Sequence, residues 1–243
     1  MNHRLFLERL LILDKREQMK RIKLKDRILP DYTNGEEIFN MVTHIVGGGL
    51  GIIYLALCVI FSAIRGNVWG VVSSAIYGGS VTALFTVSSV YHGLRHKTGK
   101  KVMQIIDHCT IYFMIAGTYT PIMLCSMRPT RPITAWLIVG LVWGISALAI
   151  TLNAIDLEKY KVFSMICYIG LGWCVIFTIV PVYKAMGFYG FMFLLLGGIL
   201  YTVGAIFYGI GAKKRYIHSV FHIFVVLASI MHFICILFYI ILK

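Results

Sequence analysis

The residues best suited to chemistry are histidines set four apart in an apolar run, IHSVFHIFVVLASIMHF over residues 217–233. His218 and His222 are about one helical turn apart, so both project from one helix face with about 40° between them. A pair placed this way can hold one metal ion. Ser88 and His92 repeat the spacing in SSVYH, near the end of another apolar run. The spacing therefore predicts a site shared between two helices.

A carboxylate occurs at a matching position in a third apolar run. Asp107 belongs to IIDHCT, just after the basic residues Lys100 and Lys101. An ionisable group inside a membrane span costs about 2.5–3.5 kcal/mol on insertion scales, so such a residue is a functional candidate. Three neutral imidazoles and one water form an open tetrahedral zinc site, and three helix ends at one depth can build one. For any single cluster, hydrogen-bonded packing is the alternative.

The composition indicates the medium in which these helices lie. Of 243 residues 59% are hydrophobic and only 14% are charged, and the mean hydropathy is +0.82. An average soluble domain has about 45–50% apolar and about 25% charged residues. We therefore expect a multi-pass protein of the cell membrane. The net charge of +13 does not indicate nucleic acid binding, because the basic residues lie between the apolar runs instead of on one folded face.

Seven apolar stretches are long enough, or nearly so, to cross about 30 Å of hydrocarbon. They cover approximately residues 38–62, 68–94, 105–126, 133–150, 162–182, 188–211 and 217–241. With these spans, 18 of the 23 Lys and Arg residues fall on the side of the N-terminus and five on the other. The positive-inside rule then predicts a seven-helix bundle with a cytosolic N-terminus and an extracellular C-terminus. The three polar clusters lie at cytosolic helix ends.

The chain divides into a basic segment, residues 1–36, and a transmembrane domain, residues 37–243. The segment mixes a short apolar run with dense charge in DKREQMKRIKLKDR. It can form a helix on the anionic inner leaflet, or its charges can serve only to fix the topology. The six cysteines fall inside predicted spans without CxxC spacing, so they are expected to be small core residues.

Four motifs together resemble one known family. They are EIFNMVTH (37–44), SSVYH (88–92), DHCTIYFMIAGTYTP (107–121) and HSVFH (218–222). The chain resembles the hemolysin III proteins, bacterial relatives of the progestin and adipoQ receptors, over most of residues 36–241. The resemblance implies a seven-helix bundle with a cytosolic N-terminus, in agreement with the charge distribution.

The resemblance also assigns roles to individual residues. It implies zinc ligation by His92, His218 and His222. It implies that Asp107 holds a water at the metal and that Ser88 lies beside it. Three further polar residues match the first motif, and they either orient the ligands or fasten helix ends: Glu37, Asn40 and His44. For His44, packing or support of a ligand is favoured over direct ligation.

Three functions remain open at this stage. The first is a zinc-dependent hydrolase for a lipid amide or ester, similar to a ceramidase, with Asp107 as general base and Ser88 as a donor to the oxyanion. The second is a pore-forming or lytic protein, although a pore requires a stripe of polar residues along whole spans and none is visible. The third is a receptor or envelope-stress protein with structural zinc. Membrane lipids are the expected partners in each case.

Overall fold

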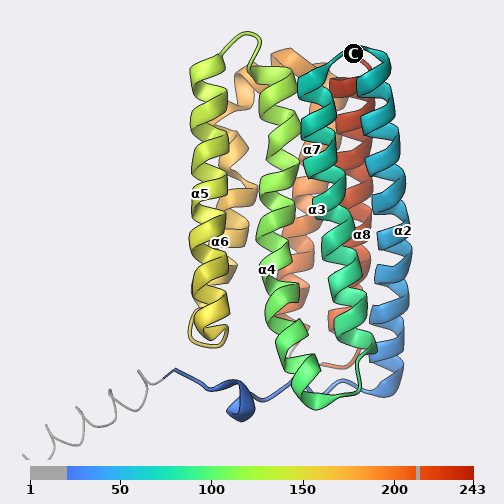
Figure 1. Cartoon of the computed structure of the whole chain (residues 1–243), viewed down its shortest axis with the longest axis vertical. Helices are drawn as coiled ribbons and strands as arrows, with labels where there is room; N and C mark the ends of the chain where they lie inside the picture. The colour runs from blue at the N-terminus through green and yellow to red at the C-terminus, as the bar shows by residue number, and fades with distance from the viewer. Residues whose placement is uncertain (1–20, 212–213) are drawn as a thin grey trace, which may run out of the picture.

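The fold is a bundle of long helices that run side by side along one axis (Figure 1). The structure is a computed structural model, and it describes residues 21–211 and 214–243. In this part of the chain, six helical stretches are long and apolar enough to cross a membrane: Asn34–Ile64, Val68–Gly93, Lys97–Met127, Pro132–Asp156, Lys161–Gly211 and Ile217–Ile241. The chain is therefore an all-helical, multi-pass membrane protein, as its composition predicted.

The elements follow the predicted spans closely. In chain order they are η1 (Leu24–Asp26), α2 (Asn34–Ile64), α3 (Val68–Gly93), α4 (Lys97–Pro121), η2 (Ile122–Met127), α5 (Pro132–Asp156), α6 (Lys161–Gly172), η3 (Cys174–Thr178), α7 (Ile179–Gly211), α8 (Ile217–Ile236) and η4 (Leu237–Ile241). The main difference is at α4, which begins eight residues before the predicted start at 105. His96 caps this helix by accepting a hydrogen bond from the Gly99 N–H at 3.2 Å. Residues 97–104, which lie between two predicted spans, therefore form about two polar helical turns.

The stretch Lys161–Gly211 has 51 residues, about twice the length needed to cross a bilayer. It does not run straight. Gly187 has a φ of 77° and a ψ of 179°, a non-helical conformation that glycine adopts at low cost. The Trp173 indole N–H donates to the Thr202 hydroxyl at 3.0 Å, although 29 residues of straight helix would span about 43 Å. The chain therefore folds back on itself within this stretch, and α6 and the second half of α7 lie side by side.

Close packing of α2 against α3 sets the geometry of the site. A Cβ atom added at Gly78 would lie 2.4 Å from the Leu55 Cα, and one at Gly51 would lie 3.0 Å from the Thr82 backbone. Small residues permit this approach of two backbones in a membrane bundle. The antiparallel pair therefore brings the first turns of α2 against the last turn of α3, where Glu37 meets His92.

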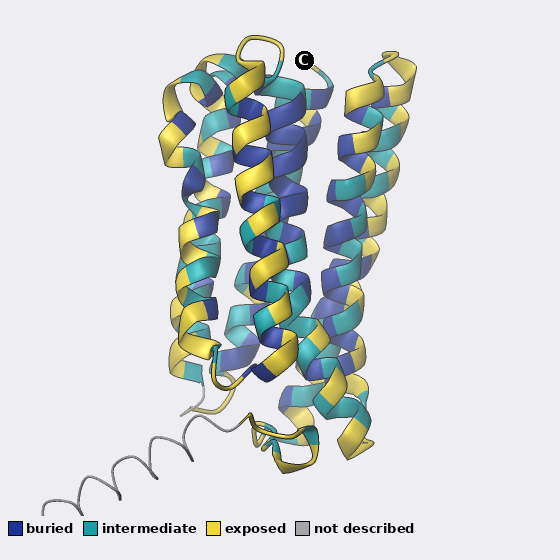
Figure 2. Cartoon of the chain, turned by 60° about the vertical axis from the view of Figure 1, so that its left-hand side comes forward, coloured by how far each residue is buried: buried dark blue, intermediate teal, exposed yellow. Residues whose placement is uncertain are grey.

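Exposed residues lie mainly on the outward faces of the helices and buried residues face the interior (Figure 2). Many exposed side chains are large and apolar, for example Ile52, Leu137 and Ile166. This arrangement suits a bundle surrounded by lipid, because the bilayer core accepts apolar groups without cost.

The described part of the N-terminal segment, residues 21–33, crosses one end of the bundle (Figure 1). The Ile22 N–H donates to Asp156, the Arg27 guanidinium donates to Gln104, and Lys101 donates to the Lys25 carbonyl. Residues 1–20, which include most of the predicted interfacial helix, lie outside the described residues. Helix α2 already begins at Asn34, so residues 34–36 of the predicted N-terminal segment belong to this helix.

Candidate metal centre

Three histidines from two helices meet at one end of the bundle. His92 lies in the last turn of α3, and His218 and His222 lie in the first two turns of α8. One ring nitrogen from each lies within 4.8 Å of the others, and the Nε2 atoms of His218 and His222 are 3.0 Å apart. All three side chains are buried. The structure thus brings together the three histidines that the sequence singled out, in a cluster that can hold a metal ion.

The start of α8 is held in place by a carboxylate on α2. Tyr216 precedes the helix with a left-handed φ of 60°, and its N–H donates to Glu36 at 2.7 Å. The Arg215 guanidinium donates to the same carboxylate at 3.3 Å. Glu36 also accepts from Thr33 in the capping box of α2. This buried carboxylate therefore joins the beginning of α2 to the beginning of α8, which presents His218 to His92.

The donor set fits a zinc ion. In a tetrahedral zinc site with Zn–N distances of about 2.0–2.1 Å, two ligand nitrogens lie about 3.3 Å apart. Small side-chain movements would therefore bring the three histidine nitrogens to bonding distance from one ion. The Nε2 of His92 is buried and has no hydrogen-bond partner in the structure. A buried polar atom of this kind is costly to leave unsatisfied, and a metal ion at the cluster would satisfy it. Imidazole nitrogen is also a preferred zinc ligand.

The other nitrogen of His92 contacts a residue whose role the sequence left open. The His92 Nδ1 lies 2.7 Å from a carboxylate oxygen of Glu37. The second oxygen of Glu37 lies 2.8 Å from the Lys100 ammonium. Lys100 also donates to the backbone carbonyls of His92 and Leu94, at 3.3 and 3.2 Å. One ligand of the cluster is thus supported from α2 and α4 as well as by its own helix.

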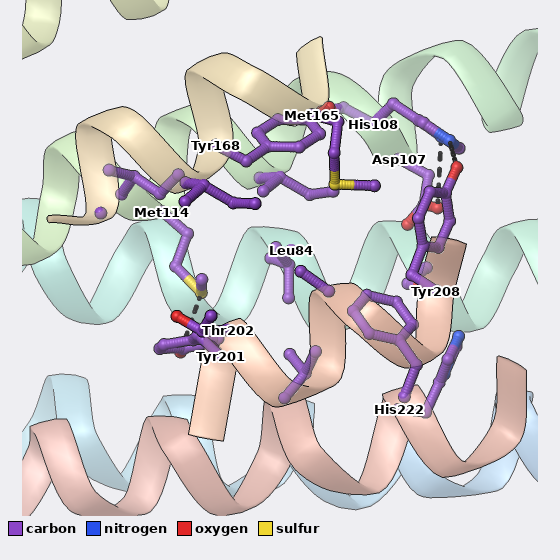
Figure 3. A pocket seen from close by; sticks show the side chains of 18 of the residues that line it. Leu84, Asp107, His108, Met114, Met165, Tyr168, Tyr201, Thr202, Tyr208 and His222 are labelled. Atoms are coloured by element: carbon purple, nitrogen blue, oxygen red, sulfur yellow. Dashed lines mark hydrogen bonds and ion pairs between the residues drawn. The ribbon is translucent and has the colours of Figure 1, made fainter. Parts of the chain in front are cut away.

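A large cavity opens beside the histidines and runs along the bundle between α3, α4, α6, α7 and α8 (Figure 3). Its volume is about 180 Å³. It extends from His218 to His232, which are about 21 Å apart along α8. Between these ends the walls are mainly apolar, with side chains such as Leu84, Ile111, Met165, Ile169, Ala205 and Val225.

Asp107 and Ser88 line the same cavity as His218 and His222. Figure 3 shows Asp107 entering from α4 and His222 from α8, both at the polar end. Asp107 is not one of the three residues whose ligand atoms cluster. The carboxylate thus shares the cavity with the histidines, and contact through a water is compatible with this placement.

Two pocket residues were not expected from the sequence. His108 accepts a hydrogen bond from the Tyr208 hydroxyl at 2.9 Å, because its Nδ1 donates to the Gln104 carbonyl at 2.8 Å. The His108 Nδ1 also lies 3.8 Å from the Asp107 carboxylate. Both side chains line the cavity, and His108 is not part of the histidine cluster. In the sequence the adjacent DH pair was the only signal, and Tyr208 had none.

A tyrosine of the N-terminal segment covers the cluster. The Tyr32 ring stacks on the His218 ring with centroids 4.9 Å apart and an interplanar angle of 18°. Tyr32 and Pro30 both line the mouth of the cavity. Burial raises the pKa of the Tyr32 phenol, so this hydroxyl stays protonated beside the histidines.

Three other histidines are not part of the cluster. His96 is exposed and caps α4. His232 lies at the far end of the cavity, with its Nε2 3.2 Å from the Leu194 carbonyl. His44 stacks on His222 with ring centroids 3.8 Å apart, but it is not part of the ligand set.

Comparison with known proteins agrees with this architecture. The sequence pattern described as "Haemolysin-III related" matches residues 32–233. The Hemolysin-3 homolog of Bacillus subtilis (strain 168) is 38% identical over 208 residues, which cover 86% of this chain and 96% of that protein. Hemolysin-3 of Bacillus cereus is 37% identical over 205 residues, covering 84% and 92%.

A more distant relative comes from animals. The human monocyte to macrophage differentiation factor is 28% identical over 173 residues, which cover 68% of this chain and 69% of that protein. Residues 32–233, which match the family pattern, contain all three clustered histidines and Asp107. On the strength of the family match and the bacterial relatives, the chain belongs to the haemolysin-III-related family of membrane proteins.

Proposed function

We propose that the protein is a zinc-dependent hydrolase that cleaves an amide or ester bond of a membrane lipid. One observation carries the proposal: the histidine cluster, Asp107 and Ser88 all lie at one end of a long, mainly apolar cavity. A lipid acyl chain matches the apolar length of this cavity. Its carbonyl group would then lie at the polar end, where the chemistry-bearing residues are.

The side chains at this end can each take a different chemical role in hydrolysis. His92, His218 and His222 would hold the ion. When bound, zinc supplies a Lewis acid that polarises the scissile carbonyl and makes water more acidic. Asp107 would take a proton from the attacking water, and Ser88 would donate a hydrogen bond to the carbonyl oxygen.

The bond changes balance without any further reactant. A C–O bond forms between the water oxygen and the carbonyl carbon, and the C–N or C–O bond to the leaving group breaks. The proton held by Asp107 passes to the leaving nitrogen or oxygen. The products are a fatty acid and an amine or alcohol, and the apolar walls keep bulk water away from the acyl chain.

We further propose that the chain crosses the membrane seven times, with its N-terminus in the cytosol and its C-terminus outside. The reversal within Lys161–Gly211 supports two crossings by this stretch. The excess of Lys and Arg on the N-terminal side supports the orientation. The metal centre would then lie close to the inner leaflet, at the depth of lipid amide and ester linkages.

The Asp107→Asn variant tests the proposed activity. Purified wild type and variant are placed in liposomes and assayed for fatty acid released from ceramides, acyl amides and phospholipids. The amide keeps the size of the side chain but cannot act as a base, so hydrolysis should fall by about 10²–10⁴-fold while zinc stays bound. Gln104→Glu, another pocket residue of α4, provides a matched control for a change of charge at this wall.

The names of the bacterial relatives make lysis the competing function, so dye leakage from the same liposomes is measured in parallel. A lytic protein depends on lipid-exposed or subunit-contact surfaces and not on a buried carboxylate. Absence of product across the lipid panel, together with equal leakage caused by wild type and Asp107→Asn, would replace the hydrolase with a lytic protein.

A further inference from the structure

One contact of the histidine cluster is short and is supported from more than one helix. The Glu37 carboxylate lies 2.7 Å from the Nδ1 of His92, a distance typical of a charge-assisted hydrogen bond. The His92 side chain is completely buried, and that of Glu37 is 18% exposed. Water therefore has little access to compete for the imidazole.

This contact determines which nitrogen of His92 faces the ion. An ionised carboxylate only accepts hydrogen bonds, so the Nδ1 of His92 must carry the proton. The lone pair of the neutral ring then belongs to Nε2, the buried atom without a partner. Nε2 is thus the atom free to join His218 and His222 as a ligand.

The same carboxylate is fixed from a third helix. The Lys100 ammonium lies 2.8 Å from the other oxygen of Glu37 and donates to the His92 and Leu94 carbonyls at the end of α3. These carbonyls belong to the last helical turn, where a cation is favourable. Lys100 therefore holds the backbone of the ligand and the carboxylate that orients its ring.

We propose that Glu37 and Lys100 are a positioning pair that fixes the tautomer and ring orientation of His92 for metal binding. The inference rests on the proposed zinc site but does not depend on hydrolysis. Neither residue touches the ion, and both act through His92. Carboxylate partners of ligating histidines commonly contribute 10–100-fold to metal affinity.

Glu36, the neighbour of Glu37, makes different contacts, so the proposed positioning role is specific to Glu37. Glu36 is turned about 100° from Glu37 around α2, and it accepts from Thr33, Arg215 and the Tyr216 N–H. Glu36 thus holds the residues that precede α2 and α8, whereas Glu37 contacts His92, one of the proposed metal ligands. If both glutamates only secured the beginning of α2, both would contact loop residues. Glu37 instead contacts His92 and Lys100.

Zinc affinity of the purified protein, measured by competition with a chromogenic chelator, tests the proposal. Glu37→Leu should bind zinc about 10–100-fold more weakly than wild type. Glu37→Gln keeps an acceptor without the charge, so it should fall between the two. Glu158→Gln, which changes an exposed carboxylate that pairs with Lys161, should bind as wild type does. Wild-type affinity in Glu37→Leu would overturn the proposal.

Nitrogen-15 NMR of histidine-labelled, zinc-free protein supplies a readout that general destabilisation would not produce. The His92 ring should show protonated Nδ1 in wild type and a mixture of tautomers in Glu37→Leu, while His232 stays unchanged. Because this measurement needs neither metal nor substrate, failure of the proposed function leaves its result intact. A His92 ring protonated on Nε2 in wild type would contradict the inference.

Variants of Lys100 complete the test. Lys100→Met should weaken zinc binding, and Lys100→Arg should restore most of it, because the guanidinium can still reach a carboxylate. In a Glu37→Gln background, Lys100→Met should cause a smaller further loss than it does alone. Lys101→Met is the matched control, since the Lys101 ammonium donates to the Lys25 carbonyl, outside the positioning pair. Equal, additive losses in both backgrounds would show that the two residues act separately.

Discussion

His44 illustrates why a buried histidine near a metal centre need not be a ligand. Its ring lies almost parallel to that of His222, at an interplanar angle of 23°, and meets the Phe85 ring edge-on at 5.0 Å. A ring stacked on a ligand cannot direct its nitrogens at the same ion as easily as a ring that meets the ligand edge-on. His44 therefore packs behind His222 and limits the orientations of that ring.

Replacement by an aromatic ring of similar size tests this interpretation. His44→Phe keeps the stacking surface but has no ring nitrogen, so the purified protein should retain zinc at the wild-type level. His222→Phe removes a ligand and should lose it. Zinc is counted by elemental analysis, with folding checked by thermal unfolding in detergent. Loss of zinc in a folded His44→Phe protein would make His44 a ligand.

The sequence predicted the clustering of His218 and His222 because helical spacing alone places both on one helix face. It left Glu37 open, because its contact with His92 depends on how α2 packs against α3, 55 residues away along the chain. His108 follows Asp107 directly and, like it, lines the cavity without joining the histidine cluster. Adjacent residues of a helix are rotated by about 100° from each other, so their side chains cannot reach one point, but both can line a broad cavity.

At the scale of helices, the most consequential element is the broken stretch that contains α6, η3 and α7. Its apolar sequence gives a clear prediction of two spans, yet helical residues fill nearly all of the 51-residue stretch, with interruptions at Trp173 and Gly187. The reversal depends on Gly187 and is stabilised by Trp173 and Thr202 across the fold. Tyr183 and Phe191, eight residues apart, also contact each other edge-on with ring centroids at 5.6 Å.

Cysteine labelling in intact cells tests whether this stretch crosses the membrane twice. In protein with its native cysteines replaced, Glu158→Cys and Lys214→Cys precede and follow the stretch. Two crossings place both on the same, cytosolic side, so an impermeant reagent should modify neither until the cells are opened. Lys184→Cys, near the reversal, should be modified from outside. Opposite accessibility of Glu158→Cys and Lys214→Cys would show a single crossing.

Helix ends were less predictable than helix existence. Hydropathy located the apolar parts of all the spans, but it could not show that the charged KTGKK stretch continues as the first turns of α4. That extension matters, because it gives Lys100 a fixed position on a helix. A flexible loop at residues 93–104 could not hold its ammonium against both Glu37 and the end of α3.

At the scale of the whole molecule, one end of the bundle collects nearly everything that can do chemistry. The end of α3, the beginning of α8 and the first turns of α2 and α4 meet there, and residues 21–33 cross it. The rest of the bundle provides an apolar exterior for lipid and an apolar cavity for a chain. This division is consistent with the proposed hydrolysis of a membrane lipid.

The central claim is that this end of the bundle holds zinc through three imidazoles. X-ray absorption at the zinc edge of the purified, detergent-solubilised protein tests it most directly. We predict about one zinc per chain, with a first shell of nitrogen and oxygen at about 2.0–2.1 Å and the outer-shell scattering of three imidazole rings. A sulfur shell at about 2.3 Å, or protein that takes up no zinc, would contradict the account.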